Sequence, residues 1–140
     1  MRVYVASSWR NDRQPAVVAA LQRVGHEVYD FRYPDVHVEG FAWENVDAGW
    51  REWTPEQFRE ALQDPLCEIG FGFDMAALMS CDAAVLVMPC GRSAHLELGW
   101  AAGAGKRTII LLAENAEPEL MYRMADRLCI SLDEVLTALK

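Results

Sequence analysis

Short apolar runs alternate with stretches of helical periodicity along this chain, and no other feature restricts the possible folds as much. Apolar runs of strand length, bounded by polar or turn residues, predict buried β-strands. The predicted strands are Val3–Ala6, Glu27–Phe31, Ala83–Met88, Arg107–Leu112 and Arg127–Ile130. The predicted helices are Gln14–Val24, Pro55–Leu62, Asp74–Ser80, Ser93–Ala104 and Ser131–Leu139. Strands and helices in alternation predict an α/β fold with a parallel sheet.

Five strands with intervening helices fit a flavodoxin-like, doubly wound sheet with the strand order 2-1-3-4-5. The chain has 140 residues, the length of one domain, so we expect a single domain over residues 1–140. In this order the topological switch point lies between the carboxyl ends of the first and third strands, where open α/β sheets bind ligands. Two loops meet there, SSWRN and PCGRS. Their candidate substrate-binding residues are Ser7, Ser8, Trp9, Arg10, Gly91, Arg92 and Ser93.

One segment departs from a plain α/β pattern. The link between Phe31 and Ala83 is much longer than a crossover helix requires, and it contains Trp43, Trp50 and Trp53. Two interpretations of this Trp-rich insertion between strands 2 and 3 are open. The aromatic rings could cover the site and stack on a base, or they could form a satellite hydrophobic cluster that holds the insertion together.

Composition excludes several classes of partner. The net charge of −8 and the lack of a basic stripe argue against nucleic acid and anionic membranes as partners. No apolar stretch has the length of a membrane span and no signal-peptide pattern opens the chain, so we expect a cytoplasmic protein. The four cysteines lack C-x-x-C spacing, and no His, Cys, Asp and Glu spacing predicts a metal site. We therefore expect reduced thiols, no metal and no cofactor.

Glu97 is a charged residue in an otherwise small and apolar helix. At about 100° per residue, the residues within about 60° of it are Ser93, Ala94, Trp100, Ala101 and Ala104, and His95 points to the opposite side. Such a face lets a ligand or another backbone come close. Desolvation there would raise the Glu97 pKa or require a hydrogen-bonding partner. The alternative is that Glu97 only complements the helix dipole from an exposed first turn.

Taken together, GRSAHLELGWAAGAGKR and the preceding DMAALMSCDAAVLVMP resemble the nucleoside 2-deoxyribosyltransferase superfamily, which includes nucleoside 5′-monophosphate N-glycosidases. The family pattern has an aspartate that opens a helix, an aspartate before a hydrophobic strand, a glycine-containing loop and a Glu-Leu-Gly-x-Ala helix. These parts are Asp74, Asp82, Gly91 and Glu97–Ala101. The resemblance covers residues 1–31 and 72–113 and does not extend to the Trp-rich link.

The first loop is also similar to that family. The opening VYVASSWRN resembles its first strand and loop, where the nucleotide-hydrolase branch has a Gly-Ser-x-Arg stretch that receives the phosphate. Ser8 and Arg10 match that serine and arginine, whereas Ser7 stands in place of the glycine. The resemblance thus implies a phosphate site at this loop.

What the resemblance implies for catalysis centres on Glu97. This residue would attack C1′ of the ribosyl or deoxyribosyl group, and a second base or water would resolve the glycosyl ester. A carboxylate suits this chemistry because the transition state resembles an oxocarbenium ion and two displacements retain the anomeric configuration. Asp74 would bind or protonate the departing base, although an aspartate before MAALM is also a good N-cap. We expect Asp82 to be structural.

Other mechanisms and an assembly also follow from the sequence. Cys90 precedes a helix, where a thiol pKa can fall, so a Cys90 nucleophile with His95 is one alternative. Two alternative functions are a TIR-like NAD glycohydrolase and a non-catalytic nucleotide sensor. The resemblance implies oligomers whose neighbours help to complete each site. We therefore expect at least a homodimer, with the Trp-rich link or the segment Glu117–Met124 reaching towards the neighbour's site.

Overall fold

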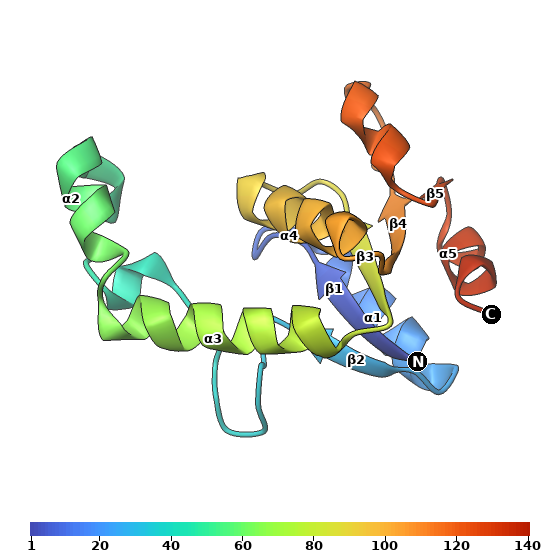
Figure 1. Ribbon diagram of the computed structural model, residues 1–140, viewed down its shortest axis with the longest axis horizontal. Coiled ribbons are helices and arrows are strands. Elements are labelled where there is room, and N and C mark those ends of the chain that lie inside the picture. Colours follow the sequence, from blue (N-terminus) through green and yellow to red (C-terminus); the bar gives the residue numbers. More distant parts are fainter. The chain divides into compact units, whose positions relative to one another are not determined.

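The computed structural model describes all residues from Met1 to Lys140, and they divide into two compact units. The sheet unit contains Met1–Asp30 and Leu78–Lys140, and the excursion unit contains Phe31–Ala77. Figure 1 labels their helices and strands. No helix is both long and apolar enough to cross a membrane.

A five-stranded parallel sheet forms the centre of the sheet unit, with the order β2-β1-β3-β4-β5. The strands are β1 (Arg2–Ala6), β2 (Glu27–Asp30), β3 (Ala83–Val87), β4 (Arg107–Leu111) and β5 (Arg127–Cys129). Val85 of β3 stands opposite Val5 on one side and Ile109 on the other. All residues of β3 are buried, as expected for a central parallel strand covered on both faces. The flavodoxin-like order predicted from the alternating pattern is confirmed.

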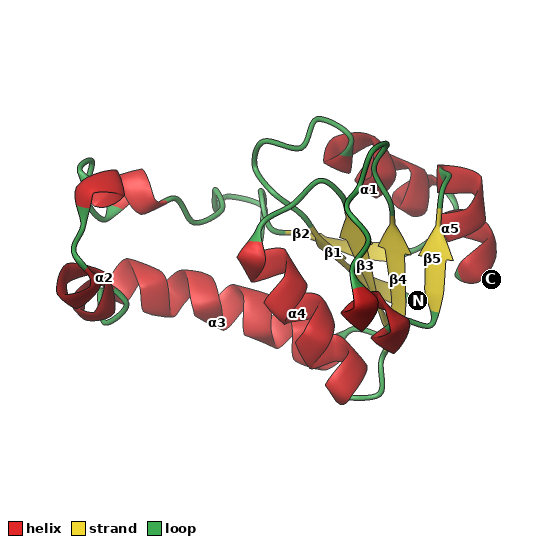
Figure 2. Ribbon diagram, turned by 90° about the horizontal axis from the view of Figure 1, so that it is seen from above, coloured by secondary structure: helices red, strands yellow, loops and turns green.

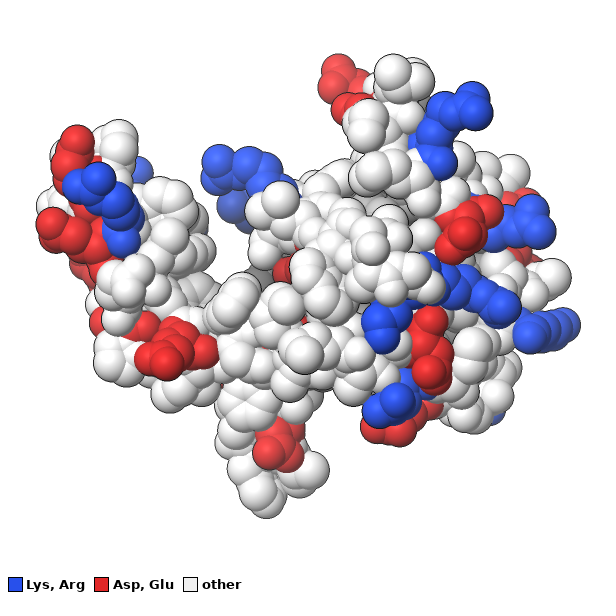
Figure 3. Space-filling model, in the orientation of Figure 1, with Lys and Arg blue, Asp and Glu red and all other residues white.

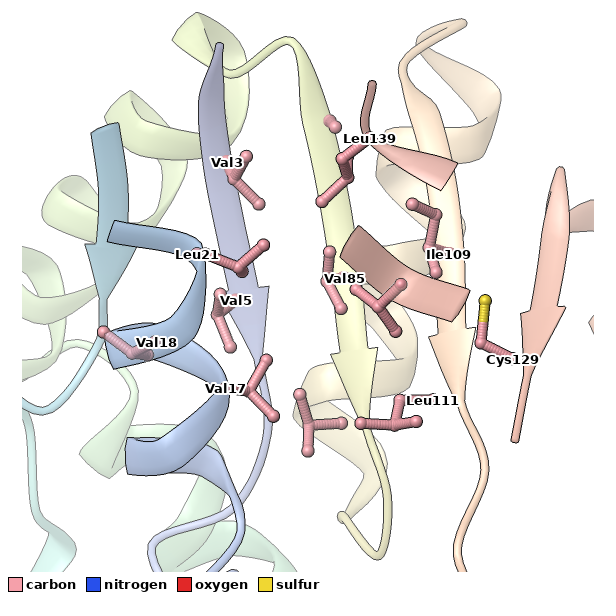
Figure 4. Close-up of a cluster of buried hydrophobic side chains, with 13 residues drawn as sticks. Val3, Val5, Val17, Val18, Leu21, Val85, Ile109, Leu111, Cys129 and Leu139 are labelled. Atoms are coloured by element: carbon pink, nitrogen blue, oxygen red, sulfur yellow. The ribbon is translucent and has the colours of Figure 1, made fainter. Parts of the chain in front are cut away.

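Three helices cover the two faces of this sheet. Helices α1 (Gln14–Arg23) and α5 (Leu132–Ala138) lie on one face, and α4 (Arg92–Gly103) lies on the other (Figure 2). Valine, leucine and isoleucine from β1, β3 and β4 pack against α1 and α5 in one aliphatic core (Figure 4). Each fully buried side chain of this kind contributes about 1.5–3 kcal/mol relative to an exposed one. This core holds the strand ends, and the loops that follow them, in place.

The excursion unit has its own aromatic cluster. Its elements are η1 (Trp43–Asn45), η2 (Trp50–Glu52), α2 (Pro55–Ala61) and the greater part of α3 (Pro65–Ser80). The Trp43 ring lies 4.8 Å from the Phe41 ring, 5.6 Å from Trp53 and 6.0 Å from Phe58, each edge to face. These rings therefore pack on one another, which favours the satellite-cluster interpretation of the insertion.

Helix α3 begins earlier than predicted. The Asp64 side chain accepts a hydrogen bond from the Leu66 N–H at 2.8 Å, and Pro65 occupies the first helical position. Asp74 consequently lies inside the helix, so the interpretation of Asp74 as an N-cap is wrong. Gly70 obscured the pattern, because a glycine in mid-helix resembles a break. Its role is close packing, since a Cβ at Gly70 would come within 2.9 Å of the Phe41 Cβ.

Candidate active site at the carboxyl edge of the sheet

The loops after β1 and β3 leave neighbouring strands at the same edge of the sheet. Side chains of the first loop donate hydrogen bonds to backbone carbonyls of the second. The Ser7 hydroxyl donates to the Val87 carbonyl at 2.8 Å, and the Asn11 amide donates to the Val87 and Pro89 carbonyls at 3.0 and 3.1 Å. The prediction that these two loops meet is confirmed.

Asn11 is a buried polar residue of this edge, with 2% of its surface exposed. Its Nδ2 also lies 3.1 Å from the Ser7 Oγ, and its Oδ1 accepts a hydrogen bond from the Arg13 N–H at 2.9 Å. Sequence analysis did not identify this residue. Its only sequence signal is a polar run, Asn-Asp-Arg, directly at the predicted switch point.

Arg13 extends the same network to β4. Its Nη1 donates to the Met88 carbonyl at 3.3 Å and to the Leu112 carbonyl at 3.2 Å. These carbonyls follow the ends of β3 and β4, so one guanidinium joins two strand ends. The Arg13 guanidinium is therefore bound to the chain's own backbone, unlike the guanidinium groups of Arg10 and Arg92.

Two other arginines at this edge have no such partner. Neither the Arg10 nor the Arg92 guanidinium forms a hydrogen bond or an ion pair within the protein. Both side chains are exposed, and each belongs to one of the two facing loops or to the helix turn that follows. Trp9 is 48% exposed beside Arg10, and the Ser8 hydroxyl accepts a hydrogen bond from the Arg10 N–H at 3.3 Å.

The N-terminus of α4 adds further hydrogen-bond donors. Gly91 is its N-cap residue, and no side chain caps the first turn, which contains Arg92 and Ser93. Uncapped N–H groups at a helix N-terminus favour an anion. The edge thus offers two guanidinium groups and a helix N-terminus to a negatively charged ligand.

Glu97 lies in the second turn of α4 and is half-buried. The Ser93 hydroxyl donates to Glu97 Oε1 at 3.1 Å, which is the hydrogen-bonding partner that the small-residue face required. Because α4 has no acidic residue in its first turn, the helix-dipole alternative for Glu97 is wrong. One carboxylate oxygen is thus fixed by Ser93.

Cys90 and His95 come together, but not as a nucleophile and its base. The Cys90 Sγ lies 3.8 Å from His95 Nδ1, which is also 2.8 Å from the Gly91 carbonyl. Burial, followed by the nearby charge of Glu97, raises the pKa of the Cys90 thiol to about 11. At neutral pH the thiol is protonated, so this environment argues against cysteine catalysis.

Tyr122 connects the β4–β5 link to the same helix end. This residue belongs to η3 (Leu120–Met124), and its hydroxyl lies 2.8 Å from His95 Nε2, with the two rings stacked at 5.7 Å. The Tyr122 hydroxyl is also 3.4 Å from the Met88 Sδ. The segment expected to reach a neighbour is therefore anchored on its own chain through Tyr122, a contact that the sequence did not indicate.

The two aspartates of the family pattern belong to other elements than the two loops and α4. Asp74 is half-buried on α3 within the excursion unit. Asp82 lies at the amino edge of the sheet, where its Oδ2 accepts a hydrogen bond from the Arg2 N–H at 2.7 Å. The structural role expected for Asp82 is thereby confirmed.

Comparisons with known proteins place the fold. No family model matches the chain, and no curated protein does. Among solved structures, the CMP N-glycosidase BcmB of Clostridium botulinum aligns with a TM-score of 0.56 at 21% identity, over 99% of this chain and 97% of that one. A 2-deoxyribosyltransferase from Bacillus psychrosaccharolyticus aligns with a TM-score of 0.65 at 17% identity, over 96% and 90% respectively. The chain therefore has the fold of both enzymes, which are of the two kinds that the sequence resembles.

Proposed function

We propose that this chain is an enzyme that cleaves or transfers the N-glycosidic bond of a nucleoside, deoxynucleoside or nucleoside 5′-monophosphate, with Glu97 as the nucleophile. The observation that carries the proposal is the half-buried carboxylate of Glu97, oriented by Ser93, on the helix that follows β3 at the switch point. The fold shared with an N-glycosidase and a deoxyribosyltransferase supports the same conclusion.

The proposed reaction has two displacements. A Glu97 oxygen forms a bond to C1′ while the C1′–N bond breaks, and the bonding electrons leave with the base. The departing base takes a proton from a general acid, for which Asp74 is the candidate. Water or a second base then attacks C1′ and gives its proton back to the deprotonated general acid, while the ester bond breaks and Glu97 regains its carboxylate.

The unpaired cations favour a phosphorylated substrate. Arg10 has no protein partner, and a guanidinium binds a phosphate through two parallel hydrogen bonds. Arg92 and the N–H groups that follow Gly91 are the competing donors. The Ser7 hydroxyl already donates its proton to Val87, so it can offer a substrate only an acceptor lone pair.

A mass-spectrometric screen tests this function. Nucleosides, their 5′-monophosphates including cytidine 5′-monophosphate, and NAD would be incubated with the protein, with and without an acceptor base. We expect release or exchange of the base by the native protein and none by Glu97→Gln. Release of nicotinamide from NAD alone would instead support a TIR-like glycohydrolase. Tight binding of an unchanged nucleotide would support a sensor.

We also propose that the chain forms at least a homodimer. Large apolar side chains are exposed on α4 and η3, among them Leu96 at 75%, Trp100 at 38% and Leu120 at 77%. In Figure 3 much of the surface over α4 is white, with blue Lys or Arg atoms at the N-terminal end of the helix. Light scattering at micromolar concentration should show two or more copies, and activity should fall on dilution. A fully active monomer would contradict both the dimer and a site shared between copies.

A further inference from the structure

Asn11 is the side chain through which the two loops of the site are joined most extensively. We propose that Asn11 is a positioning residue: it fixes the β1–α1 loop, which carries Arg10, at a set separation from the β3–α4 loop, which leads to Glu97. This role rests on the proposed function of the two loops. It requires no contact between Asn11 and the substrate.

The geometry around the Asn11 amide leaves no donor unused. Its Nδ2 has two N–H groups and faces three oxygen atoms, those of Ser7 Oγ, the Val87 carbonyl and the Pro89 carbonyl, all within 3.1 Å. One N–H is therefore shared between two acceptors. Since Asn11 is 2% exposed, water cannot readily replace these hydrogen bonds, and loss of the amide would leave buried carbonyls unsatisfied.

The amide bonds to Val87 and Pro89 cross between the loops, whereas the amide bond to Ser7 and the backbone bonds of Asn11 stay within the first loop. Its N–H donates to the Ser8 carbonyl at 3.0 Å, and its carbonyl accepts from the Gln14 N–H at 3.3 Å. The backbone thus shapes the first loop, and the side chain attaches that loop to Val87 and Pro89 on either side of Met88. A shorter side chain at position 11 would keep the local backbone bonds and lose the amide bonds to Val87 and Pro89.

The proposed reaction depends on the distance between the β1–α1 and β3–α4 loops. In a nucleoside monophosphate the distance between the phosphate and C1′ is limited by the sugar. If Arg10 holds the phosphate and Glu97 attacks C1′, the loops must keep the spacing that this limit sets. A misplacement of about 1 Å can lower a rate by about 10²-fold, so Asn11 would act on turnover more than on binding.

The test compares Asn11→Ser with Thr108→Val. Thr108 is 1% exposed, and its hydroxyl donates to Asp126 Oδ2 at 3.1 Å at the amino edge, so the control also removes a buried hydroxyl hydrogen bond but away from the site. With cytidine 5′-monophosphate, or whichever monophosphate loses its base in the screen, Asn11→Ser should lower kcat by about 10- to 100-fold and change KM by less than about threefold. Thr108→Val should leave both constants of the folded protein unchanged.

Hydrogen exchange supplies a measurement that does not depend on activity. In Asn11→Ser, amide exchange should rise both at residues 8–10 and at residues 90–92, whereas Thr108→Val should raise exchange at neither loop. If Asn11→Ser does not fold, Asn11→Thr keeps the same single hydroxyl donor, fills more of the space of the lost amide, and should show a change in the same direction. An increase confined to residues 8–10, or a kcat equal to that of the control, would overturn the positioning role. If the native protein releases no base from any substrate, the proposed function fails, and the exchange pattern still decides whether Asn11 couples the loops.

Discussion

Charged side chains at the two edges of the sheet differ in their binding partners. At the amino edge, several charged side chains bind backbone groups of the chain. Lys106 Nζ donates to the Met79 and Cys81 carbonyls at 2.9 and 2.8 Å, and Arg107 donates to the Ala138 carbonyl at 3.2 Å. Asp126 accepts from the Thr108 N–H at 2.7 Å in the same way. These groups close the ends of elements.

At the carboxyl edge, one neutral and one cationic side chain bind the backbone of the loops, and two further cations have no partner in the protein. Asn11 and Arg13 bind the backbone carbonyls, whereas the Arg10 and Arg92 guanidinium groups bind nothing in the protein. Leaving a cation unpaired beside a buried network contributes nothing to folding. The comparison therefore separates charged groups that bind the chain's own backbone from the two that we propose bind a ligand, and each of the following predictions tests one of these two sets.

The largest effect is expected from Glu97→Gln. This change keeps the side chain's size and its hydrogen bond from Ser93 but removes the proposed nucleophile, so turnover should fall by about 10³-fold or more. The thermal unfolding midpoint should stay close to that of the native protein, which a calorimetric scan would check. Near-normal base release by the variant would place the chemistry elsewhere.

Arg10→Ala should have the next largest effect, and only on phosphorylated substrates. Loss of charge-assisted hydrogen bonds worth about 1.5–3 kcal/mol would raise KM for a monophosphate by about 10- to 100-fold. KM for the matching nucleoside should not change. Arg92→Ala, assayed in parallel, shows which guanidinium holds the phosphate. Equal effects of Arg10→Ala on both substrates would remove the phosphate role from this residue.

At the amino edge, Lys106→Met should affect stability alone. The Lys106 ammonium satisfies carbonyls at the C-terminal end of α3, a position where positive charge is favourable, and it is partly exposed. We expect urea titration to give a loss of about 1 kcal/mol in the free energy of unfolding. Values of kcat and KM for the folded variant should match the native ones. Altered kinetics would show that this edge also serves the reaction.

Asp82 should contribute to the stability of this edge in a pH-dependent way. The hydrogen bond from the Arg2 N–H is the main cause that holds the pKa of Asp82 below its usual value; burial opposes it, and nearby positive charges add to it. A carboxyl whose pKa is lower in the folded state stabilises the fold above its unfolded pKa, and the benefit disappears as the pH falls through the folded pKa. Asp82→Asn should therefore be less stable at pH 7, and its stability should fall less on acidification. Parallel loss in both proteins would contradict this assignment.

Cys90→Ser should have the smallest effect, although this residue lies at the carboxyl edge. Because burial and the Glu97 charge raise the Cys90 pKa to about 11, almost no thiolate exists at pH 7. Base release should change by less than about threefold, and alkylation of Cys90 at neutral pH should be slow. Loss of activity on the scale expected for Glu97→Gln would restore the cysteine alternative.

The sheet was predictable because its signal is local. Each observed strand overlaps the predicted one, with ends that differ by at most one residue, since buried parallel strands are continuous apolar runs. The start of α3 was not predictable in the same way, because Gly70 interrupts the helical pattern and its reason, the packing of Phe41, comes from a distant position.

The features of the site can be separated in the same way, into those with a local sequence signal and those that depend on contacts between distant positions. The position of Glu97 on the same helix face as small residues, and its pairing with Ser93, follow from helical periodicity. The Asn11 and Tyr122 contacts join residues far apart in the sequence, to Pro89 and His95 respectively, and no periodic pattern records such a contact. The role of Asn11 is therefore apparent only from the structure, in which the ends of β1 and β3 lie side by side.

The Trp43 cluster has a consequence for spectroscopy. Three of the five tryptophans, Trp43, Trp50 and Trp53, lie in the excursion unit, so intrinsic fluorescence reports mainly on that unit, whereas far-ultraviolet circular dichroism reports on helices and strands throughout. Replacing Trp9 and Trp100 with phenylalanine would leave every remaining indole in the excursion unit. Heating that variant while following both signals would show whether the two units lose their structure at one temperature or at two.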